Sequence, residues 1–202
     1  MLDGQIDMSD MFDAMLDQRK IYLFGDITIE SVLSIISQIH ILEHRSKKQD
    51  IELIINSDGG CVPDCLAIID AMDSSPCEIK TLVLGRALSA ACLIASNGTP
   101  GKRCAGRNAE FMYHEICETI GDVKPSHMRY YKQETSRLAK KFNGIFSRNT
   151  GRTIKEIEDI FLKKEIDIWL YAKEAKDFGI IDKIVSSKRK DIKLKHSRKN
   201  NK

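Results

Sequence analysis

Ser89 stands between an apolar run and an alanine-rich segment, in the sequence GRALSAA of residues 85–91. A serine at a turn from a strand into a helix lies near backbone N–H groups without a helical partner and near the positive end of the helix dipole. Such groups stabilise the oxyanion that forms when a hydroxyl attacks a carbonyl carbon. Ser89 is therefore a candidate nucleophile, with a small packing residue as the alternative.

His114 and Asp167 have the chemistry that a serine nucleophile needs. His114 follows the run EFMY of residues 110–113, and a histidine at the end of a strand can act as a general base near neutral pH. Asp167 stands between two isoleucines, and orienting an imidazolium is one role that gives such a carboxylate a partner. The pattern alone leaves two alternatives open: His114 could be a structural histidine, and Asp167 could be a surface aspartate packed on Trp169.

Residues 56–60, NSDGG, could bring backbone N–H groups to a ligand. They follow the apolar run of residues 51–55, and ligands of open α/β sheets bind beyond the carboxyl ends of the strands. Paired glycines let the backbone approach a ligand closely. Neither a P-loop motif nor a GxGxxG motif occurs around them, which disfavours a phosphate site and leaves an ordinary tight turn as the alternative.

The elements that must position these residues alternate between short apolar runs and amphipathic segments. Apolar runs predict strands at residues 21–24, 51–55, 79–84, 111–114 and 180–185. Helices are predicted from Thr28, at residues 62–72, 87–96, 125–148 and 172–177, and from a capping box of Thr153 and Glu156. Three strand–helix units in series indicate an α/β protein with a mainly parallel sheet. The long helix would reach roughly 35 Å, so we expect it to pack on another chain.

Length and composition narrow the class of protein. A chain of 202 residues is expected to form one domain, and it has no apolar run long enough to span a membrane. The first residues lack the features of a secretory signal, so we expect the chain in the cytoplasm, or in an organelle stroma or matrix. The six cysteines form no C-x-x-C pair and are expected to be reduced core thiols.

The net charge of +3 comes from the C-terminal end of the chain. Residues 188–202 contain eight lysines and arginines against Asp191, so residues 1–187 have a net charge of −4. No aromatic side chain that could stack on bases lies in this basic stretch. We expect a solvated, disordered tail and no nucleic-acid partner.

Seven short segments, in order, resemble the Clp protease proteolytic subunit family between residues 19 and 185. They are RKIYLFG (19–25), IINSDGG (54–60), GRALSA (85–90), GTPGKR (98–103), MYH (112–114), TGR (150–152) and AKEAKDFGIID (172–182). By this resemblance Ser89 is the nucleophile, His114 the general base and Asp167 the acid that orients it. The backbone N–H groups of Gly60 and Ala90 then form the oxyanion hole.

The resemblance also implies the crotonase-like α/β fold, with a protruding handle helix at about residues 123–150. In the family this helix interlocks two stacked heptameric rings, homomeric or mixed, around a chamber. The chain divides accordingly into an acidic N-terminal segment (1–18), a catalytic domain (19–187) and the basic tail (188–202). Members of the family usually receive unfolded chains from a AAA+ ATPase, so the subunit itself is expected to need no cofactor, nucleotide or metal.

The chain departs from the family pattern in four places. Asp58 replaces the usual proline and puts a negative charge beside the oxyanion hole. Residues 115–122 replace the usual Gln-Pro and the glycine-rich strand that aligns substrate. The positions of the ATPase docking pocket carry Glu52, Ile54 and Ser74 in place of apolar aromatic residues, and the N-terminal segment does not resemble the usual axial-pore segment.

The leading hypothesis is a serine endopeptidase that degrades unfolded proteins inside an oligomeric ring, fed by a AAA+ ATPase. Two alternatives come from other classes. One is a non-catalytic ring subunit of a mixed assembly, although such subunits generally lose a triad residue. The other is a crotonase-like acyl-CoA enzyme, which uses carboxylates for proton transfer, and no paired glutamates are evident for that role.

Overall fold

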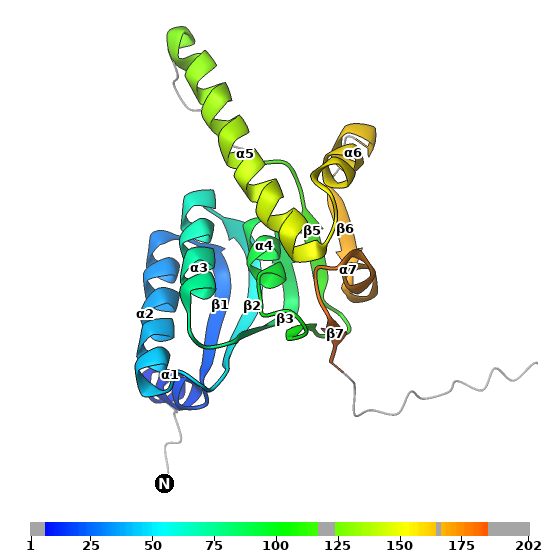
Figure 1. The fold of residues 1–202 in the computed structure, drawn as a ribbon. Coiled ribbons are helices and arrows are strands. Elements are labelled where there is room, and N and C mark those ends of the chain that lie inside the picture. Colours follow the sequence, from blue (N-terminus) through cyan, green and yellow to red (C-terminus); the bar gives the residue numbers. More distant parts are fainter. Residues whose placement is uncertain (1–6, 117–123, 165–166, 186–202) are drawn as a thin grey trace, which may run out of the picture.

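The computed structural model describes residues 7–116, 124–164 and 167–185 of the 202-residue chain (Figure 1). The helices are α1 (Met8–Asp17), α2 (Ile29–Arg45), α3 (Val62–Ser74), α4 (Ala90–Ser96), α5 (Met128–Thr150), α6 (Ile154–Lys164) and α7 (Ala172–Phe178), with a short 3-10 turn, η1 (Pro125–His127). The strands are β1 (Lys20–Ile27), β2 (Ile51–Gly60), β3 (Ile79–Leu88), β4 (Arg103–Ala105), β5 (Glu110–Tyr113), β6 (Ile168–Tyr171) and β7 (Lys183–Ile184). None of the helices in this part of the chain has the length and apolar character that a membrane crossing requires.

The described strands form one sheet that divides at β3. Strands β1, β2, β3, β4 and β7 lie side by side in this order and run parallel. Residues 81–83 of β3 pair with β4, whereas residues 86–88 pair in parallel with β5. Strand β6 then pairs with β5 in the antiparallel direction. The predicted α/β class with a mainly parallel sheet is confirmed, and the division of β3 places its carboxyl end beside β5.

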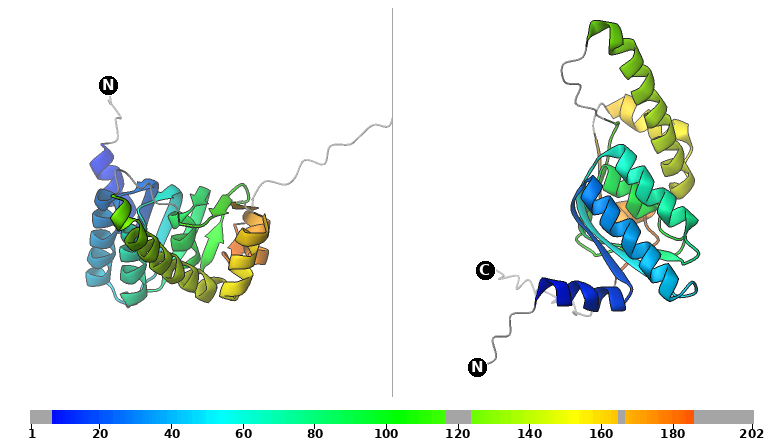
Figure 2. Two further views of the ribbon diagram at one scale, coloured as in Figure 1. Left: turned by 90° about the horizontal axis from the view of Figure 1, so that it is seen from above. Right: turned by 90° about the vertical axis from the view of Figure 1, so that its left-hand side faces the viewer.

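Helices α2, α3 and α4 form a layer against the sheet, and the core lies between the two layers (Figure 2). Helix α2 begins where predicted, because the Thr28 side chain accepts a hydrogen bond from the Ser31 N–H. Its buried residues Val32, Ile35 and Ile39 recur at helical spacing and face the sheet. The short helix α4 is buried along its whole length, so its position is fixed by packing on all sides.

Helix α5 projects beyond the sheet (Figure 1). Its buried residues, Phe142 and Phe146, lie in the C-terminal half, where the helix packs on α4 and α6. The first turns expose Met128 and Tyr130, which are 49% and 64% accessible. The helix begins at Met128 and not at residue 125, because Pro125 starts the 3-10 turn η1 instead. The packing of this arm on a second chain stays a prediction.

Three strands are longer than the sequence predicts. Strand β1 passes through Gly25, which has φ of 81° and lies where the β1–β2 register shifts. Strand β2 continues to Gly60 where a sharp turn was expected, and β3 continues to Leu88, so that α4 begins at Ala90 and not at residue 87. Glycines with positive φ bend these strands without ending them. The last strand is shorter than predicted: residues 180–185 were expected to form it, but β7 contains only Lys183 and Ile184. Ile180 and Ile181 are buried and precede the strand.

Two further expectations concern the cysteines and the chain ends. Four cysteines are buried as free thiols, namely Cys65, Cys77, Cys92 and Cys104, but Cys61 is exposed, so the prediction of a core thiol is wrong for Cys61. It precedes α3 at the end of β2, where the chain reaches the surface. In the acidic N-terminal segment, α1 packs on β1, and the Tyr22 hydroxyl donates to Met15 Sδ at 3.3 Å. Cys117 and the predicted tail lie outside the described residues.

Candidate active site

Ser89 occupies a sharp turn between β3 and α4. Its backbone has φ of 53° and ψ of −122°, and among the described residues only Arg19 is another non-glycine with positive φ. A serine keeps such a conformation only where its surroundings determine it. The Ser89 N–H donates to the carbonyl of Met112 on β5 at 2.8 Å, and the Ser89 carbonyl accepts from the N–H of Cys92 at 3.0 Å. The turn thus presents the hydroxyl at the carboxyl end of the sheet, as in other strained strand-to-helix turns that carry a nucleophile.

His114 lies directly beside this serine. It follows β5, whose pairing with β3 places Met112 opposite Leu88. His114 Nε2 and Ser89 Oγ are 2.7 Å apart, which is a short hydrogen bond between a hydroxyl and an imidazole. This geometry lets the imidazole accept the serine proton, as a general base must. The structure therefore brings together two residues that are 25 positions apart in the sequence.

Tyr113 anchors the end of β5 on helix α5. Its side chain is 1% exposed, its hydroxyl donates to Asn143 Oδ1 at 2.8 Å, and its ring stacks on Phe146 with 3.8 Å between centroids. Burial raises the pKa of the Tyr113 hydroxyl, so the hydroxyl keeps its proton for the bond to Asn143. The residue next to His114 is therefore held by both packing and hydrogen bonding.

Asp167 lies at the register position opposite His114. Strand β6 is antiparallel to β5, and its first residue, Ile168, is opposite Tyr113, the last residue of β5. Continuing this register by one residue places Asp167, which precedes β6, opposite His114, which follows β5. Asp167 is exposed. Asp167 is thus a surface residue, as the alternative of a surface aspartate packed on Trp169 requires, and Trp169 itself is 55% exposed.

Gly59 and Gly60 pack closely against neighbouring backbone. A Cβ atom on Gly59 would lie 2.7 Å from the Leu88 carbonyl oxygen and 2.9 Å from Ser89 Cβ, and one on Gly60 would lie 2.4 Å from the Ile27 carbonyl oxygen. Gly59 also lies against the nitrogen of Ala90, the first residue of α4. Its own N–H donates to Ser57 Oγ at 3.1 Å. The backbone of Gly59 thus adjoins the serine turn, as part of a cradle for an oxyanion would, whereas Gly60 packs against Ile27 of β1.

Arg86 is a site residue that sequence reasoning missed, whereas Gly59 was predicted only as a member of the glycine pair. Gly59 touches the Ser89 turn directly, and the signal for it was the glycine pair itself. Arg86 makes a two-pronged ion pair with Asp58, with Nε to Oδ1 at 2.6 Å and Nη2 to Oδ2 at 2.7 Å. The negative charge expected beside the cradle is therefore countered by a cation. No signal in the sequence marks this pair, because it depends on the β2–β3 register.

The buried cysteine thiols near the site are poorly suited to act as the nucleophile in place of Ser89. Burial raises the pKa of the thiols of Cys65 and Cys92, so both stay protonated at neutral pH. Burial also raises the pKa of Cys61, which adjoins Gly60. In the residues that the structure describes, no three histidine, cysteine or acidic side chains are grouped to hold a metal ion.

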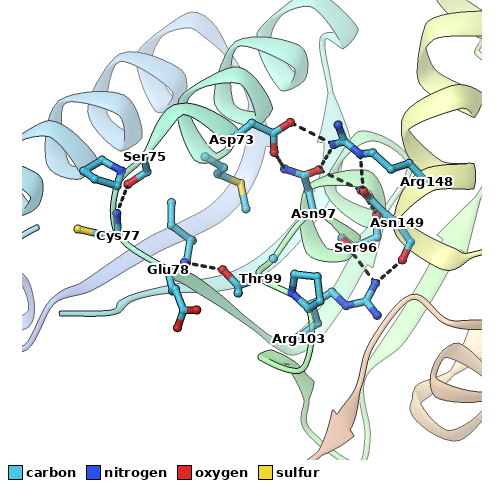
Figure 3. A pocket seen from close by; sticks show the side chains of 15 residues that line it. Asp73, Ser75, Cys77, Glu78, Ser96, Asn97, Thr99, Arg103, Arg148 and Asn149 are labelled. Carbon is cyan, nitrogen blue, oxygen red and sulfur yellow. Dashed lines mark hydrogen bonds and ion pairs between the residues drawn. The ribbon is translucent and has the colours of Figure 1, made fainter. Parts of the chain in front are cut away.

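Two cavities lie at different distances from the serine. One, of about 490 Å³, adjoins His114 and is lined by Glu115, Ile116 and residues of α5 such as Met128 and Ala139. The other, of about 430 Å³, lies at the amino end of β3, away from Ser89, and is drawn in Figure 3. Neither Ser89 nor His114 lines either cavity, and the first is linked to the serine only through Glu115, the residue that follows His114.

The chain is similar to known proteins over most of its length. The Clp protease family model matches residues 3–188. The ATP-dependent Clp protease proteolytic subunit of Streptococcus mutans is 36% identical over 179 residues, which are 88% of this chain and 90% of that protein. Proteins of the same name from Streptococcus uberis and Streptococcus pyogenes are 34% and 33% identical over the same shares.

Proposed function

This chain belongs to the Clp protease family, whose activity is that of a serine peptidase, and on that premise we propose that Ser89, His114 and Asp167 are its catalytic triad. The observation that carries the proposal is the contact of 2.7 Å between Ser89 Oγ and His114 Nε2, made by a serine in a strained turn. The register of β5 and β6 supports Asp167 as the residue that orients the imidazole.

The proposed reaction proceeds through an acyl-enzyme. Ser89 Oγ attacks the peptide carbonyl carbon while His114 Nε2 takes the hydroxyl proton, and the N–H groups of Gly60 and Ala90 donate to the oxyanion. As the C–N bond breaks, His114 gives its proton to the leaving amine. Water then attacks the ester with His114 as base again, which releases the carboxylic acid and restores Ser89. We expect Asp167 to accept a hydrogen bond from His114 Nδ1 and so to fix the orientation of the imidazole.

A fluorophosphonate probe, which reacts only with activated serines, tests the proposal. We expect one adduct per chain, located at Ser89 by mass spectrometry of the digested protein. Ser89→Ala should remove both the adduct and peptide cleavage, whereas Ser34→Ala, which alters an exposed serine of α2, should change neither. An unlabelled but fully folded protein would favour a non-catalytic subunit instead.

The proposal extends to assembly. The relatives are named as proteolytic subunits of an ATP-dependent protease, and α5 projects beyond the core as an arm that could meet another chain. We therefore expect stacked heptameric rings that enclose the Ser89 sites, without any nucleotide or metal bound to the subunit. Native mass spectrometry of the purified protein tests this, because a monomer would contradict it.

Unfolded chains are the expected substrates, delivered by a AAA+ ATPase. The positions expected to form the docking pocket are unusual: Glu52 is ion-paired with Lys80, and Ile54 is only 5% exposed. A partner for this chain is therefore expected to recognise a polar surface. The test is ATP-dependent degradation of an unfolded protein, which should accelerate only when a compatible AAA+ ATPase is added.

A further inference from the structure

The pairing of β2 with β3 is interrupted just before the serine turn. Ile55 is opposite Val83, but the next pair is Ser57 with Ala87, so β3 has extra residues between the two pairs. Such a bulge leaves the strands without a regular ladder of hydrogen bonds. On its other side, the segment of residues 56–60 pairs with β1 through Asn56, Gly59 and Gly60. On the β3 side it has the single pair of Ser57 with Ala87, so its further contacts with β3 come from side chains.

Side chains of β2 bridge this interruption. Asn56 Oδ1 accepts a hydrogen bond from the Arg86 N–H at 3.2 Å, and the Asp58 carboxylate holds the guanidinium of the same arginine through two contacts. Two parallel contacts between an arginine and a carboxylate fix distance and orientation together. Both side chains are about half exposed, at 55% and 47%, so this pair is expected to add little to the free energy of unfolding.

The bridge lies immediately next to the proposed reaction centre. Gly59 follows Asp58 and is packed against Leu88, Ser89 and the nitrogen of Ala90, with φ of 97°. Arg86 lies on β3, three residues before Ser89 in the turn that follows this strand. A shift of the Asp58 segment relative to β3 would therefore move the glycine N–H groups relative to the serine. A misplacement of about 1 Å can lower a catalytic rate by about a hundredfold.

We propose that Asp58 and Arg86 are a pair of positioning residues that hold the oxyanion cradle in register with Ser89. The inference rests on the proposed serine-peptidase function and deepens it. Arg86 has a second effect in this arrangement, because it balances the Asp58 carboxylate. An unbalanced carboxylate beside the cradle would oppose the negative charge that develops on the substrate oxygen.

The two single variants are therefore expected to differ. Arg86→Ala removes the bridge and also leaves the Asp58 charge uncompensated, so kcat should fall by roughly ten- to a hundredfold with KM for a small peptide little changed. Asp58→Ala removes the bridge alone and should lower kcat by only about threefold to tenfold. The double variant D58A/R86A should recover to the level of Asp58→Ala, because it has no unpaired carboxylate. The exchanged pair D58R/R86D should recover part of the activity.

A transition-state analogue separates positioning from substrate binding. A peptide aldehyde forms a tetrahedral adduct with the serine, so its affinity should fall in each variant by about the same factor as kcat/KM. If the pair had only a structural role, its variants would have a lower melting temperature, but kcat/KM and the affinity for the aldehyde would stay at their wild-type values. As a matched control, Arg45→Ala removes another exposed ion pair, that with Asp17 at 2.8 Å, and should alter neither kcat nor inhibitor affinity.

The experiment begins with the wild-type protein and the fluorophosphonate probe. If wild type is not labelled at Ser89, the proposed function fails and the pair has no cradle to position. If wild type is labelled but Arg86→Ala turns over peptide at the wild-type rate, the pair is not a positioning device. If Arg86→Ala changes only KM, Arg86 binds the substrate directly. If the double variant D58A/R86A is as slow as Arg86→Ala, Asp58 is not the partner of Arg86. Each of these results overturns the proposal.

Discussion

The two ends of strand β3 use polar side chains in opposite ways. At its amino end, Figure 3 shows a cavity whose polar groups satisfy one another: Arg148 donates to Asp73 and Asn97, and Asn149 donates to Ser96. At its carboxyl end, Ser89 sits in a strained turn with an imidazole at 2.7 Å. A group of mutually satisfied polar side chains holds elements together, whereas strain beside a base indicates chemistry. Cavity volume alone does not distinguish the two.

Arg103 is the centre of the amino-end network. Its side chain is 10% exposed and donates to both carboxylate oxygens of Asp182 and to the carbonyl oxygens of Asn149 and Gly179. Burial opposes ionisation of Asp182, but the hydrogen bonds and charge of Arg103 outweigh it and lower the pKa of this carboxyl. The network thus joins β4, the end of α5 and the end of α7, without any group oriented for reaction.

The largest effect is expected from His114→Ala at the carboxyl end. Without the base, peptide turnover should fall by about 10⁴-fold, because the serine proton has no acceptor. The urea midpoint should stay close to that of wild type, since His114 adds little to the core. Peptide cleavage and urea unfolding are the two measurements, with the exposed His40→Ala as control. If the His114→Ala variant has a lower urea midpoint but cleaves peptide at the wild-type rate, His114 has a structural role and not a catalytic one.

Arg103→Ala should show the reverse behaviour at the amino end. Removing the guanidinium takes away its bonds to the Asp182 carboxylate, which keeps the bond from the Arg103 backbone N–H, and to the carbonyl oxygens of Ser96, Asn149 and Gly179. The free energy of unfolding should therefore fall by about 3–5 kcal/mol. Turnover per folded molecule should be retained at a temperature where the variant is folded. Arg137→Ala, which breaks an exposed ion pair on α5, is the control and should cost less than about 1 kcal/mol. Equal losses in the two variants would contradict the role given to the network.

Gly59→Ala tests how closely the cradle must fit the serine turn. An added methyl group would lie 2.7–3.0 Å from the Leu88 carbonyl oxygen, Ser89 Cβ and the Ala90 nitrogen, so the cradle must shift, and kcat/KM should fall by about 10²-fold. Gly101→Ala is a matched control: Gly101 also has positive φ, of 84°, but open space around it. It should lower stability by about 1 kcal/mol and leave turnover unchanged. If Gly59→Ala and Gly101→Ala turn over peptide at similar rates, Gly59 has no role in the active site.

The smallest effect is expected from Arg148→Ala, at the rim of the amino-end cavity. Its side chain is 56% exposed, so loss of its bonds to Asp73 and Asn97 should cost less than about 1 kcal/mol. Peptide turnover should not change. A marked loss of turnover, measured alongside the melting temperature, would show that this cavity takes part in function and would end the contrast between the two ends of β3.

Much of the secondary structure was predictable because its signals are local. The Thr28 cap, the Thr153–Glu156 capping box and the glycine that ends α7 each act within a few residues, and all three are present. The strand ends were less predictable. Glycines such as Gly25 suggested ends of strands, but pairing with a neighbouring strand continues through the bend, and that pairing is not local.

Residue types and their order were enough to nominate Ser89, His114, Asp167 and the glycine pair. The chemistry of a nucleophile, a base and an acid belongs to their side chains, and paired glycines indicate backbone that can approach a ligand closely. Distances were a different matter. The contact of Ser89 with His114 arises because β3 divides and pairs with β5, and the Asp58–Arg86 bridge arises from a bulge between β2 and β3. Both contacts depend on strand register, which is set by packing between segments that are far apart in the chain. The register therefore cannot be predicted from the sequence of any single segment.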